Sequence, residues 1–219
     1  MQMRNTTRLA LTTFSLALVL AGCGEEKRPA PAPAAGGDTA AAPAAAPVLE
    51  EGPDVGQAIP QYKNNVRRPD AVSAKVEPFD TKAQSKPTLY IMNSTDCPYC
   101  TAYIDRMKAI EKTYMAKGVD VVHVYPMQAQ SAAQKIEHHT KQGFQGGLID
   151  DTVSEFAKIL DVEKTPTAIL TDAKGTIVYR GRIDDNAKAD RVKVNELADA
   201  LDLTLAGKPV EVSTTEPFG

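Results

Sequence analysis

The sequence is poor in cysteine and histidine, the usual ligands of structural zinc. Its 219 residues include 3 cysteines, 3 histidines and no tryptophan. Cys97 and Cys100 stand three positions apart, and Cys23 lies near the amino terminus. No second cysteine pair exists to complete a four-ligand zinc site, and the histidines are dispersed. We therefore expect no metal and no cofactor, and we expect Cys97 and Cys100 to act together.

The chain also lacks an excess of basic residues. It has 25 Lys and Arg against 28 Asp and Glu, a formal net charge of −3. Nucleic acids and anionic lipid headgroups are bound by basic patches, so we expect neither as a partner. A length of 219 residues with 42% hydrophobic residues predicts one globular domain with additional segments.

No acidic residue occurs before Glu25, whereas Arg4 and Arg8 precede an apolar run over residues 9–21. This layout is typical of a secretory signal. The run is shorter than the ~20 apolar residues that a helix needs to cross a bilayer. The run ends in Leu-Ala-Gly before Cys23, which resembles the bacterial lipobox. The resemblance implies cleavage before Cys23 and a lipid anchor on its sulfur.

Three segments follow from this reading: a lipoprotein signal peptide over 1–22, a lipidated tether rich in Ala and Pro over 23–60, and a folded domain over 61–219. The tether has no apolar period that could bury a face, and its Ala-Pro units favour extended polyproline II structure. We expect a periplasm-facing protein of the bacterial cell envelope. Gly24, where some lipoproteins carry Asp, favours the outer membrane over the inner one.

Apolar periodicity predicts the elements of the domain. Strands are expected at 88–92, 119–125, 147–150, 167–171 and 176–180, and helices from 98 to 118, over 131–140, around 153–160 and around 194–205. We expect Val66, Val72, Val76 and Phe79 to pack as an N-terminal flank. This order predicts an α/β fold, a central mixed β-sheet flanked by helices on both faces, which is the thioredoxin-like arrangement.

The dithiol motif falls between the first expected strand and the helix after it. A cysteine at the amino end of a helix has its thiolate stabilised by unpaired N–H groups, and Cys97 takes that place. With Pro98 in the first turn, Cys100 lies one turn on, within reach of a reversible disulfide. We expect Cys97 to attack and Cys100 to resolve. Asp96 either raises the pKa of Cys97 by charge repulsion or caps the helix.

Several blocks resemble bacterial redoxin-domain proteins, a thioredoxin-like family, over roughly 86–219. They are Thr95 to Pro98, Val124 to Pro126, Thr165 to Thr167, Val178 to Asp185, and Ala200-Leu201 with Leu205 to Pro209. The resemblance implies the thioredoxin-like fold, an extracytoplasmic setting and thiol chemistry at Cys97. An extra strand and helix between His123 and Pro166 indicate the larger redoxin branch.

The resemblance also assigns substrate contacts. It implies a cis proline at Pro166 that faces the dithiol and leaves the Thr165 backbone free to pair with an extended substrate. We expect Pro98 and Tyr99 to contact the substrate as well. Many relatives lack Cys100 and carry a cysteine beyond a segment like 215–219, so either the sequence is truncated or the resolving role lies with Cys100.

The function expected is a membrane-anchored thiol–disulfide oxidoreductase that acts on envelope protein thiols or disulfides and exchanges electrons with a redox partner protein, in a direction left open. One alternative is a copper-binding or partner-docking module, although we expect His138 and His139 to be solvated and His123 to lie in the core or at an edge. The other is a peroxidase, but Thr95 is two residues before Cys97 rather than three. We expect Arg180, Arg182, Asp184 and Asp185 to form a solvated loop with fold-specific pairing.

Overall fold

The computed structural model describes residues 52–69 and 75–219. The expected signal peptide, Cys23 and most of the expected tether lie outside this part of the chain. The strands are β1 Lys63–Arg68, β2 Lys75–Asp80, β3 Thr88–Met92, β4 Asp120–Tyr125, β5 Gly147–Asp150, β6 Thr167–Thr171 and β7 Ile177–Gly181. The helices are α1 Pro98–Met115, α2 Ala132–Gln142, α3 Glu155–Ile159 and α4 Glu196–Leu205, with short 3-10 turns at Thr81–Ala83 and Ala189–Arg191.

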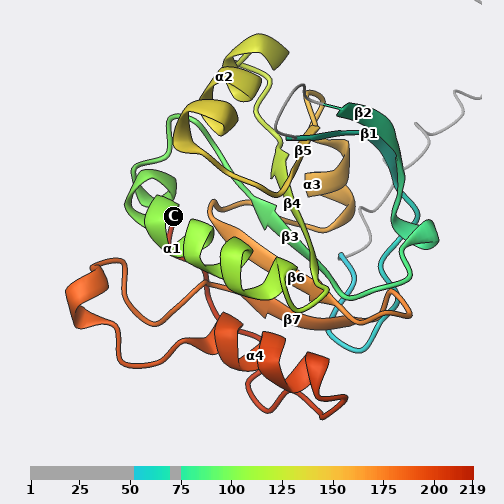
Figure 1. Cartoon of the computed structure of the whole chain (residues 1–219), viewed down its shortest axis with the longest axis vertical. Helices are drawn as coiled ribbons and strands as arrows, with labels where there is room; N and C mark the ends of the chain where they lie inside the picture. Colours follow the sequence, from blue (N-terminus) through green and yellow to red (C-terminus); the bar gives the residue numbers. More distant parts are fainter. Residues whose placement is uncertain (1–51, 70–74) are drawn as a thin grey trace, which may run out of the picture. The chain divides into compact units, whose positions relative to one another are not determined.

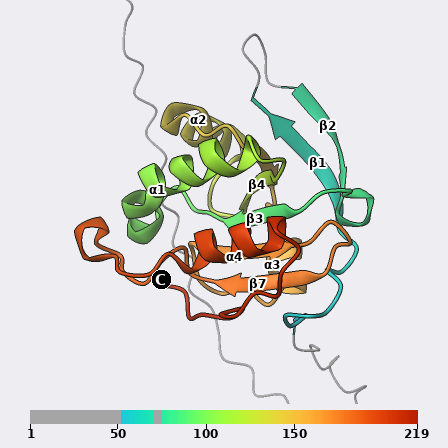
Figure 2. The same cartoon turned by 60° about the horizontal axis from the view of Figure 1, so that its bottom comes forward.

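The strands form one seven-stranded sheet in the order β2-β1-β5-β4-β3-β6-β7. Strands β3, β4 and β5 run parallel to one another, and every other neighbouring pair is antiparallel. Figures 1 and 2 show helices packed against this sheet. The expected α/β class, with a central mixed sheet flanked by helices, is therefore confirmed.

Central strand β3 is buried on both sides. Leu89 and Ile91 point into a cluster with residues of α1 and α4, whereas Tyr90 and Met92 point into a second cluster with Phe156 of α3. Successive side chains of a strand point to opposite faces, so five consecutive buried residues predict helices on both sides.

The folded part of the chain begins before Gln61, the residue at which we expected it to begin. The Ile59 side chain is fully buried, and the Gly56 N–H donates to the Ile177 carbonyl at 2.8 Å. Ala58 forms an antiparallel bridge with Thr176, the residue immediately before β7. Residues 52–60 thus pack on the sheet rather than extending the tether.

The N-terminal flank is a pair of strands, β1 and β2, that extends the sheet beyond β5. Val66 and Phe79 are buried, as expected. Val76 is instead 52% exposed, because β2 is an edge strand with one face in solvent. Val72 lies outside the described residues.

The register of the sheet places two loops side by side. β3 and β6 are antiparallel, and Met92 at the end of β3 pairs with Thr167 at the start of β6. The segment that follows β3 contains Cys97, and the segment that precedes β6 contains Thr165. Cys97 and Thr165, which are far apart in sequence, therefore meet where β3 ends and β6 begins.

A buried polar network lies close to this point, between the sheet and helices α1 and α2. The Glu111 carboxylate accepts from His123 Nε2 at 2.9 Å and from the Gly146 N–H at 2.8 Å. His123 Nδ1 lies 3.2 Å from Asn93 Nδ2, and Asn93 Oδ1 accepts from the Ser94 N–H. Because that contact orients the Asn93 amide, His123 Nδ1 is the acceptor and Nε2 carries the proton.

The network continues to α2 through His139. Tyr125 Oη lies 3.3 Å from Asn93 Nδ2 and 3.4 Å from His139 Nδ1, and His139 Nε2 donates to the Gly146 carbonyl. His139 is buried and His138 is partly buried, so the expectation of two solvated histidines is wrong. Burial lowers the pKa of His139 to about 3 and keeps it neutral. The expectation of a core position for His123 is confirmed.

We predict that Glu111→Ala destabilises the protein strongly. Burial alone would raise the pKa of Glu111, but hydrogen bonds from His123, Gln145 and Gly146 outweigh it and hold the pKa below its usual value. Removal of the carboxylate leaves these buried donors without an acceptor, at a cost of about 3 kcal/mol in the free energy of unfolding. Urea denaturation measures this.

Asp105→Ala is the matched control, because Asp105 lies on the same helix and is exposed. Its effect should stay within about 0.5 kcal/mol. Equal effects of the two substitutions would contradict a structural role for the buried network.

Candidate active site

Helix α1 positions the dithiol motif. Its N-cap is Cys97, whose sulfur accepts from the Cys100 N–H at 3.4 Å, and Pro98 occupies the first turn. Cys100, Tyr103 and Met107 lie on the buried face of the helix and fix its rotation against the sheet. Cys97 is partly exposed and Cys100 is buried, and both thiols are free.

The Thr165–Pro166 peptide bond is cis and faces the dithiol. In the thiol form, Cys97 Sγ donates to the Thr165 carbonyl oxygen at 3.1 Å. The structure thus brings together all six residues that the sequence indicated for the site: Cys97, Pro98, Tyr99, Cys100, Thr165 and Pro166.

The two sulfurs differ in acidity. Burial would raise the pKa of Cys97, but hydrogen bonds from the Thr165 side chain and from the N–H groups of Cys100 and Tyr99 outweigh it, so the pKa of Cys97 is lowered. Deeper burial raises the pKa of Cys100 to about 12, and proximity to Cys97 adds to this. The exposed sulfur is therefore the one that ionises more readily.

Asp96 does not cap helix α1, because the sulfur of Cys97 accepts the N-cap hydrogen bond instead. The Asp96 carboxylate accepts from the Gln130 side chain at 2.5 Å and from the Thr95 hydroxyl at 2.9 Å. Of the two readings of Asp96, helix capping is therefore wrong. Its contacts tie the dithiol loop to the segment that precedes α2.

The loop after β7 is less solvated than expected. Asp184 is buried and accepts from Tyr103 Oη and from the Arg106 guanidinium, each at 2.8 Å. Arg182 pairs with Glu196 at the start of α4. The expected pairing is present, but the paired side chains are mostly buried rather than solvated. They attach α1 and α4 to the loop after β7.

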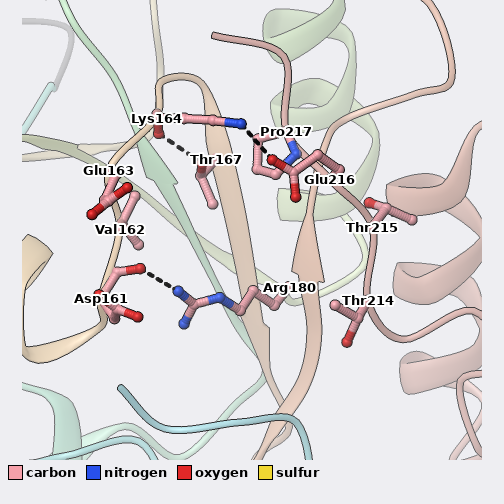
Figure 3. A pocket seen from close by; sticks show the side chains of 10 residues that line it. All are labelled: Asp161, Val162, Glu163, Lys164, Thr167, Arg180, Thr214, Thr215, Glu216 and Pro217. Carbon is pink, nitrogen blue, oxygen red and sulfur yellow. Dashed lines mark hydrogen bonds and ion pairs between the residues drawn. The ribbon is translucent and has the colours of Figure 1, made fainter. Parts of the chain in front are cut away.

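An open pocket of about 310 Å³ lies beside the Thr165–Pro166 loop. Residues 161–164, Arg180 and residues 214–217 line it, and Figure 3 shows Lys164 reaching across to Glu216. Among the residues that the structure describes, no group of three or more His, Cys, Asp or Glu side chains is placed to hold a metal ion.

Sequence reasoning missed two contributions to the site. The Thr165 side chain lowers the pKa of Cys97 and opposes the rise in the pKa of Cys100, whereas only the Thr165 backbone was considered. Phe218 stacks on Tyr99 with ring centroids 6.4 Å apart. No local signal identifies either contact, because each joins residues that are distant in the chain.

Relatives of known sequence share part of this chain. Methylamine utilization protein MauD from Paracoccus denitrificans is 25% identical over 139 residues, which is 64% of this chain and 64% of that protein. The chain thus spans just under two thirds of this relative. A MauD protein from Methylorubrum extorquens is 28% identical over 139 residues, covering 62% of its length.

Solved structures share the fold. An uncharacterized conserved protein from Geobacillus kaustophilus superimposes with a TM-score of 0.64 at 23% identity, covering 75% of this chain and 88% of that one. The family model described as Redoxin matches residues 54–201, which include the whole sheet, the dithiol motif and the Thr165–Pro166 loop. The chain therefore belongs to the Redoxin family.

Proposed function

We propose that the protein is a thiol–disulfide oxidoreductase that uses Cys97 and Cys100 on the disulfides or thiols of envelope proteins. The observation that carries this proposal is the unequal pair of sulfurs at the amino end of α1. Cys97 is partly exposed with a lowered pKa, while Cys100 one turn later is buried with a raised pKa.

In the reducing direction, the Cys97 thiolate attacks one sulfur of a substrate disulfide. The substrate S–S bond breaks, a mixed disulfide forms with Cys97, and the first substrate sulfur leaves as a thiolate that takes up a proton. Cys100 loses its proton and attacks Cys97 Sγ, which releases the second substrate thiol. The substrate gains two electrons and the Cys97–Cys100 disulfide forms; the oxidising direction is the reverse.

The Thr165 backbone supports recognition of an extended substrate segment. The Thr165 carbonyl lies 3.1 Å from Cys97 Sγ, so a segment paired with the Thr165 backbone would lie beside the sulfur. Pro98 and Tyr99 would border the same segment, and Tyr99 is 41% exposed. A second protein would restore the dithiol or the disulfide after each cycle.

A lipid anchor on Cys23 would hold this activity at the envelope membrane, with the domain facing the periplasm. The signal-like segment before Cys23 and the Ala/Pro-rich segment after it support this location. Among residues 52–69 and 75–219, no helix is both long and apolar enough to cross a bilayer. Gly24 favours the outer membrane.

We predict that Cys100→Ser traps the substrate. Without the resolving sulfur, the mixed disulfide at Cys97 persists and should appear on a non-reducing gel as a covalent complex. Cys97→Ser should give no complex and no turnover of a model disulfide such as insulin. Full activity of Cys97→Ser would show that the nucleophile is assigned wrongly.

A second prediction concerns the pH dependence of alkylation. The rate at Cys97, followed by peptide mass mapping with iodoacetamide, should rise with pH through a midpoint below the ~8.5 of a free cysteine. Cys100 should remain unreactive until far higher pH, since its pKa is raised to about 12. Thr165→Val removes a hydrogen bond to the thiolate, so the Cys97 midpoint should move upward.

Thr101→Val is the control for this shift, because its hydroxyl donates to the Cys97 carbonyl and not to the sulfur. Its midpoint should match that of the unchanged protein. Identical midpoints in all three proteins would rule out Thr165 as a determinant of the Cys97 acidity.

The anchor is tested separately. In a bacterial host that lipidates proteins, the chain should fractionate with membranes and incorporate labelled fatty acid. Cys23→Ala should abolish the label and release the protein to the soluble periplasmic fraction. Label that persists in Cys23→Ala would refute lipidation at this residue.

A further inference from the structure

The C-terminal segment lies along the outer edge of the sheet. The Arg180 N–H donates to the Ser213 carbonyl at 2.9 Å, and the Thr215 N–H donates to the Arg180 carbonyl at 3.0 Å. Thr215 Oγ1 also lies 2.8 Å from Tyr179 Oη. A Cβ atom at Gly181 would lie 2.1 Å from Thr215 Oγ1, so glycine is required for this close approach. Residues 213–215 are therefore firmly attached to β7.

Beyond Thr215 the chain leaves the sheet and ends beside the dithiol motif. Figures 1 and 2 both place the C-terminus near the first turns of α1. The Phe218 ring stacks on Tyr99, with 15° between the ring planes, and the Arg182 guanidinium carbon lies 5.6 Å from the Phe218 ring centroid. Both contacts are favourable for an aromatic side chain.

The last residue lies on the Thr165 backbone. A Cβ atom at Gly219 would be 2.7 Å from the Thr165 carbonyl oxygen and 3.2 Å from its backbone nitrogen. The same carbonyl oxygen is 3.1 Å from Cys97 Sγ. Gly219 thus occupies the position beside Cys97 where the proposed function places an extended substrate.

Residues 216–219 make few polar contacts, and the main apolar contact is that of Phe218, which is partly buried against the core cluster of α1 and α4. Lys164 pairs with Glu216, but the Lys164 side chain is 42% exposed and that of Glu216 is 77% exposed, and ion pairs that are open to solvent contribute little. Glu216 and Pro217 line one side of the open pocket of about 310 Å³, and residues 161–164 line the other (Figure 3). Displacement of residues 216–219 would leave the pairing of residues 213–215 with β7 intact.

We propose that Tyr99, Lys164, Thr165 and Arg182 form the surface on which an extended segment of a partner protein docks, and that residues 216–219 cover this surface until the partner displaces them. The proposal rests on the proposed function. The partner segment pairs with the Thr165 backbone, presents an aromatic side chain to Tyr99 and Arg182, and presents an acidic side chain to Lys164.

The first test measures access to Cys97 and requires no enzymatic activity. The purified protein is treated with N-ethylmaleimide or with a polyethylene-glycol maleimide, and modification of Cys97 is followed by peptide mass mapping. Phe218→Ala should raise the rate with the bulky reagent about three- to tenfold, the range expected for loss of one aromatic stack. The rate with the small reagent should change by less than about twofold.

Val212→Ala is the matched control, because Val212 lies on the same segment and is 54% exposed. It should leave both rates unchanged. If Phe218→Ala also leaves the bulky-reagent rate unchanged, or raises both rates equally, residues 216–219 do not cover the site.

The second test asks what the uncovered surface binds. Phe218→Ala protein is incubated with the peptide Thr-Thr-Glu-Pro-Phe-Gly or with Thr-Thr-Glu-Pro-Ala-Gly before the bulky maleimide is added. The first peptide should slow modification of Cys97 at least threefold more than the second. Equal protection, or none from either peptide, would overturn the docking of an aromatic-bearing segment.

Turnover separates this proposal from the proposed function. If the unchanged protein reduces insulin and Phe218→Ala reduces it faster, while both reduce a small disulfide equally, both proposals are supported. Equal insulin rates would overturn only the covering role of residues 216–219. Absence of any disulfide turnover, together with altered maleimide access, would instead count against the oxidoreductase.

Discussion

The site depends on the contact between the amino end of α1 and the Thr165 peptide. Cys97 caps the helix and lies 3.1 Å from the Thr165 carbonyl, so one sulfur is held by two parts of the chain that are distant in sequence. The antiparallel pairing of β3 with β6 makes this contact possible, because it places Met92 opposite Thr167. Without that register, the dithiol would remain on its helix but lose its contact with the Thr165 backbone.

The buried network supports the loop between β3 and α1, which carries Cys97. Glu111 on α1 accepts from His123 on β4 and from the N–H groups of Gln145 and Gly146, so it ties a helix, a strand and a loop together. A buried carboxylate is tolerated only when its hydrogen-bonding capacity is satisfied. Through His123 and Asn93 the network orients the Ser94 N–H, three residues before Cys97.

The sequence predicted the inner strands more closely than the edges. Residues 88–92, 147–150 and 167–171 form strands as expected, because apolar side chains fill strands that are covered on both faces. Strand β1 was not recognised, since its sequence Lys-Asn-Asn-Val-Arg-Arg has one apolar residue and depends on pairing with β2 and β5. The burial of His139 was missed because its partner Gly146 and its neighbour Tyr125 are brought to it by the fold.

The same division applies to the site. The spacing of Cys97 and Cys100 after a strand and before a helix was enough to predict that Cys97 lies at the amino end of α1 with Cys100 one turn on; the attacking and resolving roles of the two sulfurs remain predictions. The Thr165 hydroxyl, the buried Asp184 and the Phe218 ring were not predictable, because each acts on a residue brought near by the fold. Cys23 and most of the Ala/Pro-rich segment lie outside the described residues, so the proposed lipid anchor and tether rest on the sequence alone.

The central claim is that Cys97 and Cys100 form a two-electron redox couple. It is tested most directly by equilibrating the purified protein in graded dithiol–disulfide buffers and quantifying each cysteine by alkylation and mass spectrometry. The account predicts that Cys97 and Cys100 become protected together as one disulfide, with a midpoint between about −270 and −120 mV. If no Cys97–Cys100 disulfide forms in any buffer, the oxidoreductase assignment is contradicted.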